Sequence, residues 1–333
     1  MYQEVLPNIY LINVPLPESP LKSVNTYFIK GLEGQKNLIV DSGFNEPASK
    51  AAFFEAMVSL DFSYANTDFL ATHLHSDHFA IMRAIEDRRP KIYLGRYDKA
   101  HLTQRSEMNS TSDYFAFTAK LYGLPEVLVD EDAPFVRNTP TENSIERIIG
   151  VNAGDVFEVG GYSFEAVLFE GHTPGHIGLY DKEKKVLLCG DHLLGNISSN
   201  ITYWKDNFDS LGSYLSSLSM LNQLDVEHLL CGHRSNDFDI KARIAELFDH
   251  HTERLSEVVD ILAASKKSMT SYEVAAKMTW SVREDMWEKY SDQQKWFATG
   301  EAMAHLEYLY KRGRVEKDMV GFTARYCSTA GNK

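Results

Sequence analysis

One short segment contains four side chains that commonly bind metal ions: His73, His75, Asp77 and His78. Neutral imidazole nitrogens and carboxylate oxygens suit Zn²⁺ and other first-row transition metals. A strand-like run, residues 68–71, precedes them, so we expect the four to begin at a strand end and continue through a loop. His73 and His75 alternate and would face one side of an extended backbone, whereas Asp77 and His78 can turn toward a second position.

Three later strand-like runs are each followed by another ligand-type side chain. The expected strand at 162–169 leads to His172, and two apolar runs further along end close to Asp191 and His233. A single histidine of this kind is more often structural than a ligand. Three such residues added to the first segment predict a metal centre assembled at strand ends.

Length and composition describe a globular protein with a large core. The chain has 333 residues, 44% hydrophobic and 24% charged, which predicts one large domain with a smaller one, or two domains. The net charge of -13 argues against nucleic acid as a partner, because phosphate binding needs a positive field, although a local basic groove stays open.

No segment is predicted to direct the chain to or through a membrane. There is no apolar run of about 20 residues and no signal-peptide pattern, so we expect no membrane partner and a cytoplasmic location. The three cysteines, Cys189, Cys231 and Cys327, are too few for a disulfide framework. Cys189 and Cys231 are expected to be small apolar fillers of buried strands.

The first hundred residues alternate between predicted strands and helices, which indicates α/β layering. Expected strands are 8–14, 24–29, 37–41, 68–71 and 91–94, and expected helices are 47–60 and 79–88. Asp41 closes the third strand. It either caps the following turn or lies behind the metal loop and orients a ligand histidine or the loop backbone.

Residues from about 96 to 150 interrupt this alternation and are interpreted as an insertion over one end of the sheet. Residues 100–123 are expected to be helical, and 129–144 show little periodicity. Tyr114 and Phe117 either pack the insertion onto the body or contact a substrate, since insertions beside a metal loop often determine selectivity.

In their order along the chain, these ligand-type residues resemble the motif series of the metallo-β-lactamase superfamily over roughly residues 7–240. The residues that carry the resemblance are His73-x-His75-x-Asp77-His78, His172, Gly190-Asp191 and Gly232-His233. The resemblance implies an α/β fold, the four-layer αβ/βα sandwich of two mixed sheets with helices outside. It also implies a binuclear metal centre between the sheet edges.

The resemblance further implies a role for each residue. It assigns His73, His75 and His172 to one metal, Asp77, His78 and His233 to a second, and Asp191 to both. His176 matches a histidine with a supporting role. Two Zn²⁺ are the expected ions, with iron or manganese as alternatives.

The ligand set also predicts chemistry. Five neutral histidines and two carboxylates leave two dications with net positive charge, which lowers the pKa of a bridging water. The resulting hydroxide would be the nucleophile. Asp191 and Asp77 are the expected catalytic residues, and Asp77 could orient the water or carry a proton instead of ligating.

Residues 241–333 are expected to form a second, mainly helical domain beside the catalytic domain, residues 1–240. Expected elements are helices at 241–264, 271–278 and 302–311 and a hairpin at 315–326, with Thr270 and Glu273 at capping-box spacing. This order resembles the winged-helix-like C-terminal domain of some hydrolases in the superfamily. We expect a structural or lid role.

The leading function is hydrolysis of a small ester, thioester or lactone, as in glyoxalase II-like members of the superfamily. The alternatives are a phosphodiesterase or ribonuclease and a non-catalytic metal-binding sensor. Lactonases of the superfamily usually carry a tyrosine soon after the bridging aspartate, whereas here Leu194 and Gly195 follow and Tyr203 would have to substitute. The expected partner is a small-molecule substrate; a homodimer is compatible with the sequence.

Overall fold

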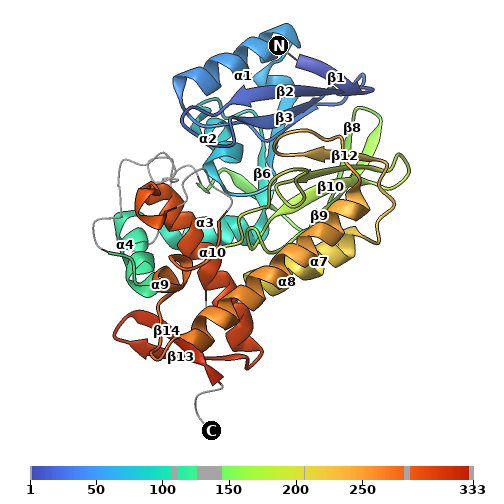
Figure 1. Cartoon of the computed structure of the whole chain (residues 1–333). Helices are drawn as coiled ribbons and strands as arrows, with labels where there is room; N and C mark the ends of the chain where they lie inside the picture. Colours follow the sequence, from blue (N-terminus) through green and yellow to red (C-terminus); the bar gives the residue numbers. More distant parts are fainter. Residues whose placement is uncertain (1, 107–110, 126–144, 206, 281–285, 330–333) are drawn as a thin grey trace.

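The computed structural model describes residues 2–106, 111–125, 145–205, 207–280 and 286–329. Its larger part consists of two mixed β-sheets with helices along them, and its smaller part consists of helices and a two-stranded hairpin (Figure 1). The first sheet lies at one end of the molecule, and the two-stranded hairpin lies at the other end (Figure 1).

The first sheet has seven strands in chain order, antiparallel from β1 to β4 and parallel from β4 to β7. They are β1 (Tyr2–Leu6), β2 (Ile9–Pro15), β3 (Ser23–Ile29), β4 (Asn37–Val40), β5 (Thr67–Ala71), β6 (Ile92–Gly95) and β7 (Ile148–Val151). Every residue of β4 is buried, as expected for a strand covered on both faces.

The second sheet has five strands in the order β12-β11-β10-β9-β8, with β11 and β12 parallel and the other pairs antiparallel. They are β8 (Val156–Val159), β9 (Tyr162–Leu168), β10 (Ile177–Asp181), β11 (Val186–Gly190) and β12 (His228–Cys231). The strands predicted around 162–169, 185–189 and 227–231 are therefore present.

Helices cover the outer face of each sheet. Against the first sheet lie α1 (Pro47–Ser59), a short 3-10 helix η1 (Tyr64–Asn66), α2 (Ser76–Ala84) and α3 (Arg96–Ser106), and against the second lie α7 (Ser210–Leu221) and the start of α8 (Ile240–Ala264). Phe53 of α1 and Phe79 of α2 share one apolar cluster with Ile39 of β4. Leu211 of α7 shares another with Leu187 of β11.

Alternation along the strands produces the layers. In β4, Leu38 and Val40 face the core between the two sheets, while Ile39 faces the core beneath the helices. In β11, Leu188 faces the core between the sheets and Leu187 faces α7. Helix, sheet, sheet and helix thus form four layers, and the αβ/βα sandwich expected from the resemblance is confirmed.

The smaller part has its own apolar core. It is built from α4 (Thr111–Tyr122), the end of α8, α9 (Ser271–Ala275), the 3-10 helix η3 (Trp287–Lys289), α10 (Asp292–Lys311) and the hairpin of β13 (Val315–Val320) and β14 (Thr323–Ser328). Helix α8 joins both parts: Leu247 packs in the core of the second sheet, and Leu262 packs in the smaller core (Figure 1). The division at residue 240, like the winged-helix likeness, stays a prediction.

Two helix predictions in the smaller part need correction. The capping box predicted at Thr270 is present, but its helix ends at Ala275 rather than at residue 278. Helix α10 begins at Asp292 rather than at residue 302, because a second capping box, Ser291 with Gln294, starts it earlier.

The described part of the predicted insertion contains two helices and a strand. The helical stretch expected at 100–123 contains two helices, α3 and α4, and β7 joins the first sheet beside β6, so the sheet resumes before residue 150. Residues 129–144 lie outside the described residues. Among the helices that the structure describes, none is long and apolar enough to cross a membrane.

Candidate metal centre

The first predicted ligands follow the C-terminal end of β5, as expected, but the second half of the segment is helical. Helix α2 begins at Ser76, directly after His75, so Asp77 and His78 lie in its first turn and not in a loop. The predicted start at residue 79 was too late and the predicted end at residue 88 too late as well, since α2 stops at Ala84. The His78 ring nevertheless lies beside His73, with ring centroids 4.1 Å apart.

Three histidines form a first cluster. His73 Nε2 lies 2.9 Å from His75 Nδ1 and 3.2 Å from His172 Nε2. His172 follows β9 in the second sheet, so this cluster joins the edges of both sheets. His73 and His172 are buried, and His75 is partly exposed.

A second cluster lies beside the first. His78 Nε2 lies 3.2 Å from His233 Nε2, and Asp77 Oδ2 lies 3.4 Å from the same His233 nitrogen. His233 follows β12, the strand parallel to β11. The second cluster therefore also takes ligand-type atoms from both sheets.

Asp191, just beyond β11, lies between the two clusters. Its Oδ2 is 3.4 Å from His233 Nε2 and 3.9 Å from His172 Nε2, and its Oδ1 is 3.4 Å from His78 Nε2. Oδ1 is buried and has no hydrogen-bond partner in the described part of the chain. The structure thus brings all seven predicted ligand residues together.

Asp41 contacts the second cluster. Its Oδ2 accepts a hydrogen bond from His78 Nδ1 at 2.8 Å, and its Oδ1 accepts the backbone N–H of Thr72 at 2.8 Å. Asp41 has a φ of 61°, a left-handed conformation that turns its side chain back toward the loop. These contacts are the ones expected of the orienting role considered for Asp41, and that role stays a prediction.

Four of the histidines donate a hydrogen bond from Nδ1 to an oxygen, so the Nε2 atom of each ring faces a cluster. The acceptors are Thr72 Oγ1 for His73 at 3.1 Å, Asp41 Oδ2 for His78 at 2.8 Å, the Asn200 carbonyl for His172 at 2.8 Å, and the Ser23 carbonyl for His233 at 2.7 Å. These contacts point four Nε2 atoms at the clusters, where each can bind a metal ion when its imidazole is neutral.

His176 supports the centre from behind. Its Nε2 accepts the backbone N–H of Asp191 at 3.1 Å, and its ring stacks on His73 with centroids 5.0 Å apart. Gly190, with a φ of 50°, allows this approach, because a Cβ there would lie 2.6 Å from Thr72 Oγ1 and 2.8 Å from His176 Nε2.

Sequence reasoning missed Asp98, in the first turn of α3. Its buried carboxylate accepts the Leu74 N–H at 2.9 Å, the Thr173 hydroxyl at 2.7 Å and the Gly175 N–H at 2.6 Å. Leu74 lies between two ligand histidines and Thr173 follows a third, so Asp98 ties their loops together. A lone aspartate in a polar helix carries no signal that would have revealed this role.

Sequence reasoning also missed Trp204, between β11 and α7. The indole stacks on His75, with centroids 6.0 Å apart and planes inclined by 25°, and its Nε1–H donates to the His172 carbonyl at 3.1 Å. His101 of α3 packs edge-on against the same indole, 5.0 Å between centroids. Trp204 is therefore part of the wall of the first cluster.

The predicted substrate contacts are placed less directly. Tyr203 lies against Tyr122 of α4, with centroids 6.4 Å apart, and Phe117 of α4 is half exposed. The side chain of Tyr114 lies outside the described residues. Roles for Tyr203, Phe117 and Tyr114 in substrate binding stay predictions.

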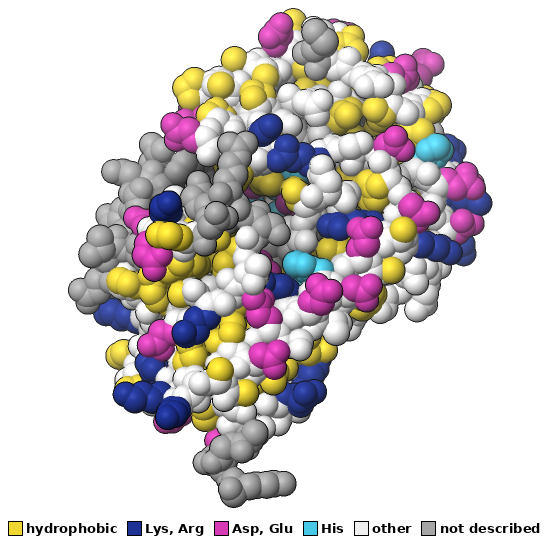
Figure 2. Space-filling model, viewed as in Figure 1, with side chains coloured by type: hydrophobic (Ala, Val, Ile, Leu, Met, Phe, Trp, Pro, Cys, Tyr) yellow, Lys and Arg dark blue, Asp and Glu magenta, His cyan; other side chains and the backbone are white. Residues whose placement is uncertain are grey.

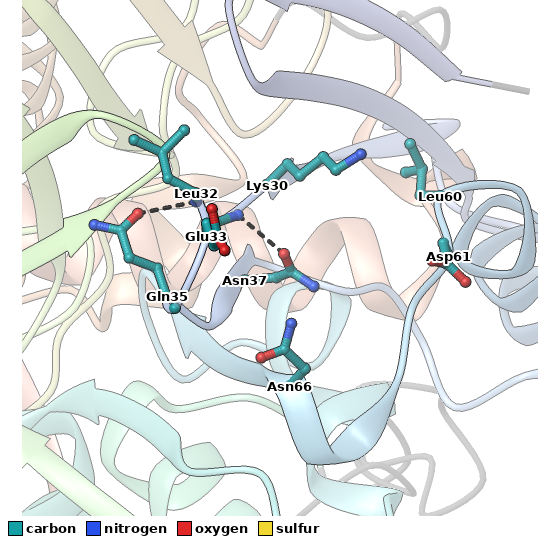
Figure 3. A pocket seen from close by; sticks show the side chains of 10 residues that line it. Lys30, Leu32, Glu33, Gln35, Asn37, Leu60, Asp61 and Asn66 are labelled. Carbon is teal, nitrogen blue, oxygen red and sulfur yellow. Dashed lines mark hydrogen bonds between the residues drawn. The ribbon is translucent and has the colours of Figure 1, made fainter.

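A separate hollow lies near the N-terminal ends of β4 and β5, opposite to the ends that lead to the histidines. It surrounds the turn between β3 and β4, where the Gly31 N–H donates to Asn37 Oδ1 at 2.9 Å, and Lys30 and Asn66 lie at its edge (Figure 3). Asn37 begins β4 and Asn66 directly precedes β5, whereas the histidines follow the end of β5. The hollow is therefore not part of the candidate metal centre.

The geometry is matched by the comparisons with known proteins. Residues 20–233, which include every predicted ligand, match the family model described as the Metallo-beta-lactamase superfamily. The chain belongs to the metallo-β-lactamase superfamily. Residues 260–326 match a second family model, the Metallo-beta-lactamase-like, C-terminal domain.

Two similar proteins extend over most of the chain, and a third extends over half of it. A probable metallo-hydrolase of Bacillus subtilis, YqjP, is 23% identical, over 91% of this chain and 92% of that protein. The crystal structure of a metallo-beta-lactamase family protein from Thermus thermophilus has a TM-score of 0.78 and 27% identity, over 98% of this chain and 100% of that one. An atrochrysone carboxyl ACP thioesterase of Aspergillus chevalieri is 27% identical, over 50% of this chain and 54% of that protein. The prediction of a metal-dependent hydrolase of the metallo-β-lactamase superfamily is confirmed.

The donor atoms of this metallo-β-lactamase fold suit a divalent cation. Ligands about 2.0–2.2 Å from a tetrahedral zinc ion lie roughly 3.3–3.6 Å from one another. The donor separations in the two clusters, 2.9–3.9 Å, span that value. The convergent Nε2 atoms and the unpartnered Asp191 Oδ1 fit such an ion as well.

Electrostatics point the same way. Burial lowers the pKa of His233, but the Asp191 and Asp77 carboxylates raise it to about 10. Asp191, Asp41 and Asp77 likewise raise the pKa of His78 well above its ordinary value, against the effect of burial. Positive charge therefore stabilises the buried carboxylates, and a divalent cation at the same place would supply it.

Proposed function

We propose that this hydrolase binds two divalent metal ions, most simply Zn²⁺, and hydrolyses a small ester or thioester, with lactones as a related substrate. The observation that carries the proposal is the pair of clusters with Asp191 between them, at 3.4 Å from His78 and His233 and 3.9 Å from His172. One shared carboxylate between two histidine sets is the arrangement expected for two adjacent cations.

Such ions, when bound, lower the pKa of water and polarise a carbonyl oxygen. In ester or thioester hydrolysis, water adds to the acyl carbon, its proton passes to a base, and the bond from carbon to oxygen or sulfur breaks to release an acid and an alcohol or thiol. Asp77, whose Oδ2 lies 3.4 Å from His233 Nε2, is the residue that would take the proton or orient the water. Burial raises its pKa, but His78 and His233 lower it to about 2, so the carboxylate is ionised at neutral pH.

The substrate class rests on chemistry around the site. Trp204 and His101 give the first cluster an aromatic wall, which suits an acyl group better than a polyanion. Among the described residues on the face shown in Figure 2, acidic and basic side chains are interspersed, and the net charge is -13. One similar protein is a thioesterase, which supports a thioester among the candidates.

The test combines metal counting with a substrate panel. Purified protein supplied with zinc should contain about two equivalents, and Asp191→Asn should lower turnover by more than ~100-fold while the far-ultraviolet circular dichroism stays unchanged. The panel sets aryl esters, glutathione thioesters, lactones and β-lactams beside bis-aryl phosphodiesters and single-stranded RNA. Faster turnover of the phosphodiesters, or zinc binding with no turnover in the whole panel, would contradict the proposal.

A further inference from the structure

The segment of residues 200–204, between β11 and α7, touches the first histidine cluster from behind. The Asn200 carbonyl accepts the hydrogen bond from His172 Nδ1 at 2.8 Å. This bond fixes both the tautomer and the rotation of the His172 ring, so the position of the segment determines where His172 Nε2 points.

Trp204 gives the same segment two further contacts. Its Nε1–H donates to the His172 carbonyl at 3.1 Å, and its indole lies over the His75 ring at 6.0 Å between centroids. Two of the three histidines of the first cluster therefore depend on the segment. The second cluster is oriented differently, through Asp41 and the Ser23 carbonyl.

The segment is held in turn by two helices outside the sandwich. Tyr122 of α4 is buried, and its hydroxyl donates to the Tyr203 carbonyl at 3.3 Å and lies 3.4 Å from Thr202 Oγ1. Helix α10 approaches at Gly300, where a Cβ would overlap Thr202 Oγ1 and lie 3.4 Å from Thr202 Cβ. A glycine is needed there for close approach, not for an unusual backbone angle.

We propose that residues 200–204 are a positioning segment through which α4 and α10 set the geometry of the first cluster, with Thr202 and Trp204 as the positioning residues. The helices of the smaller part thereby act on metal binding through this segment. The inference rests on the proposed function, because it treats His75 and His172 as ligands.

A substitution at Gly300 provides the sharpest test. Gly300→Ala should displace Thr202 and weaken one of the two zinc equivalents by about 10-fold or more, leaving the other at wild-type affinity. Alanine favours a helix by roughly 1 kcal/mol over glycine, so lost helix propensity cannot explain a weaker site. Adding Thr202→Ala removes the overlapping oxygen and should restore the affinity.

A second, independent test uses the indole N–H. Trp204→Phe keeps an aromatic ring over His75 but loses the bond to the His172 carbonyl. Trp280→Phe is the matched control, since Trp280 Nε1 donates to a backbone carbonyl, that of Ala275, at 2.8 Å in the smaller core. Only Trp204→Phe should weaken one zinc equivalent, and only in that variant should the change of tryptophan emission on adding zinc be lost.

Zinc affinities are measured by competition with a chromophoric chelator, alongside thermal melting of the metal-free proteins. Wild-type affinity for both equivalents in Gly300→Ala, failure of Thr202→Ala to restore a lost affinity, or equal behaviour of the two tryptophan variants would each overturn the inference. Normal zinc binding by the wild type in that case leaves the proposed function standing. A wild-type protein that binds no zinc would overturn both.

Discussion

Asp98 offers a quantitative test of how the ligand loops are held. It is fully buried and accepts three hydrogen bonds, two from the backbone N–H groups of Leu74 and Gly175 and one from the Thr173 hydroxyl. Asp98→Asn retains one oxygen and replaces the other with an NH₂ group. In either orientation of the amide, one backbone N–H then faces a donor, whereas the Thr173 hydroxyl can rotate.

A buried N–H left without an acceptor costs about 1–3 kcal/mol. Asp98→Asn should therefore lower the free energy of unfolding by about that amount, and Asp98→Ala, which strips the acceptor from both N–H groups, by roughly twice as much. Burial raises the pKa of Asp98 to about 7, although the three donors oppose the rise. The comparison belongs at pH 8, where the wild-type carboxylate is ionised and accepts all three bonds.

The assay is urea unfolding followed by circular dichroism, with chelator present so that metal affinity does not contribute. Asp155→Asn is the matched control, because Asp155 is exposed and accepts one backbone N–H, from Asn152 at 2.8 Å. It should change the free energy of unfolding by less than ~0.5 kcal/mol. The reasoning would be refuted if Asp98→Asn were as stable as this control. It would also be refuted if Asp98→Ala were no less stable than Asp98→Asn.

Three further predictions concern stability. Zinc at about 100 times its dissociation constant should raise the free energy of unfolding by ~2.7 kcal/mol per site, and a chelator should remove the gain; a melting temperature indifferent to zinc would count against a metal in the native state. Asn25→Ala removes donors to the Cys231 and Arg234 carbonyls, at 3.0 and 2.9 Å, and should cost about 1–3 kcal/mol in urea unfolding, where no loss would show that these bonds are dispensable. Burial, reinforced for His251 by its neighbour His305, lowers the pKa of His251 to about 2 and that of His305 to about 4. The unfolded chain then binds more protons, so stability should fall as pH drops from about 6.5 to 4, by ~1.4 kcal/mol per pH unit for each histidine. His305→Gln should flatten that slope, and an unchanged slope would contradict the assignment.

The ligands could be predicted from sequence because their signal is local. His73 and His75 alternate at a strand end, and Asp191 and His233 each follow an apolar run, so residue type and position coincide. The layering of the sheets follows from the alternation of strand side chains between the two faces of a sheet. The continuous apolar run of residues 38–40 in β4, a strand buried at every position, indicates a sheet covered on both faces.

What the sequence left out depends on contacts between distant segments. The start of α10 was missed because its capping box, Ser291 with Gln294, precedes residues with a mixed apolar and polar pattern. Asp98 and Trp204 are single residues in segments without periodicity. Their roles come from hydrogen bonds with loops that lie 24 to 77 residues away in the sequence. No spacing rule connects such residues with the histidines.

The groups that orient the histidines show why sequence reasoning could not predict these contacts. The acceptors for His172 and His233 are the main-chain carbonyls of Asn200 and Ser23, 28 and 210 residues away. Every residue has a main-chain carbonyl, so the residue types of Asn200 and Ser23 do not predict that they accept these hydrogen bonds. Only the path of the folded chain shows it. The predicted ligand side chains are of the types that suit a divalent cation, while the backbone path of two remote segments determines how two of the histidines are oriented. Because α4 and α10 press on one of those segments and neither contributes a ligand, the smaller part of the protein has a route to the metal centre that its own side-chain chemistry does not reveal.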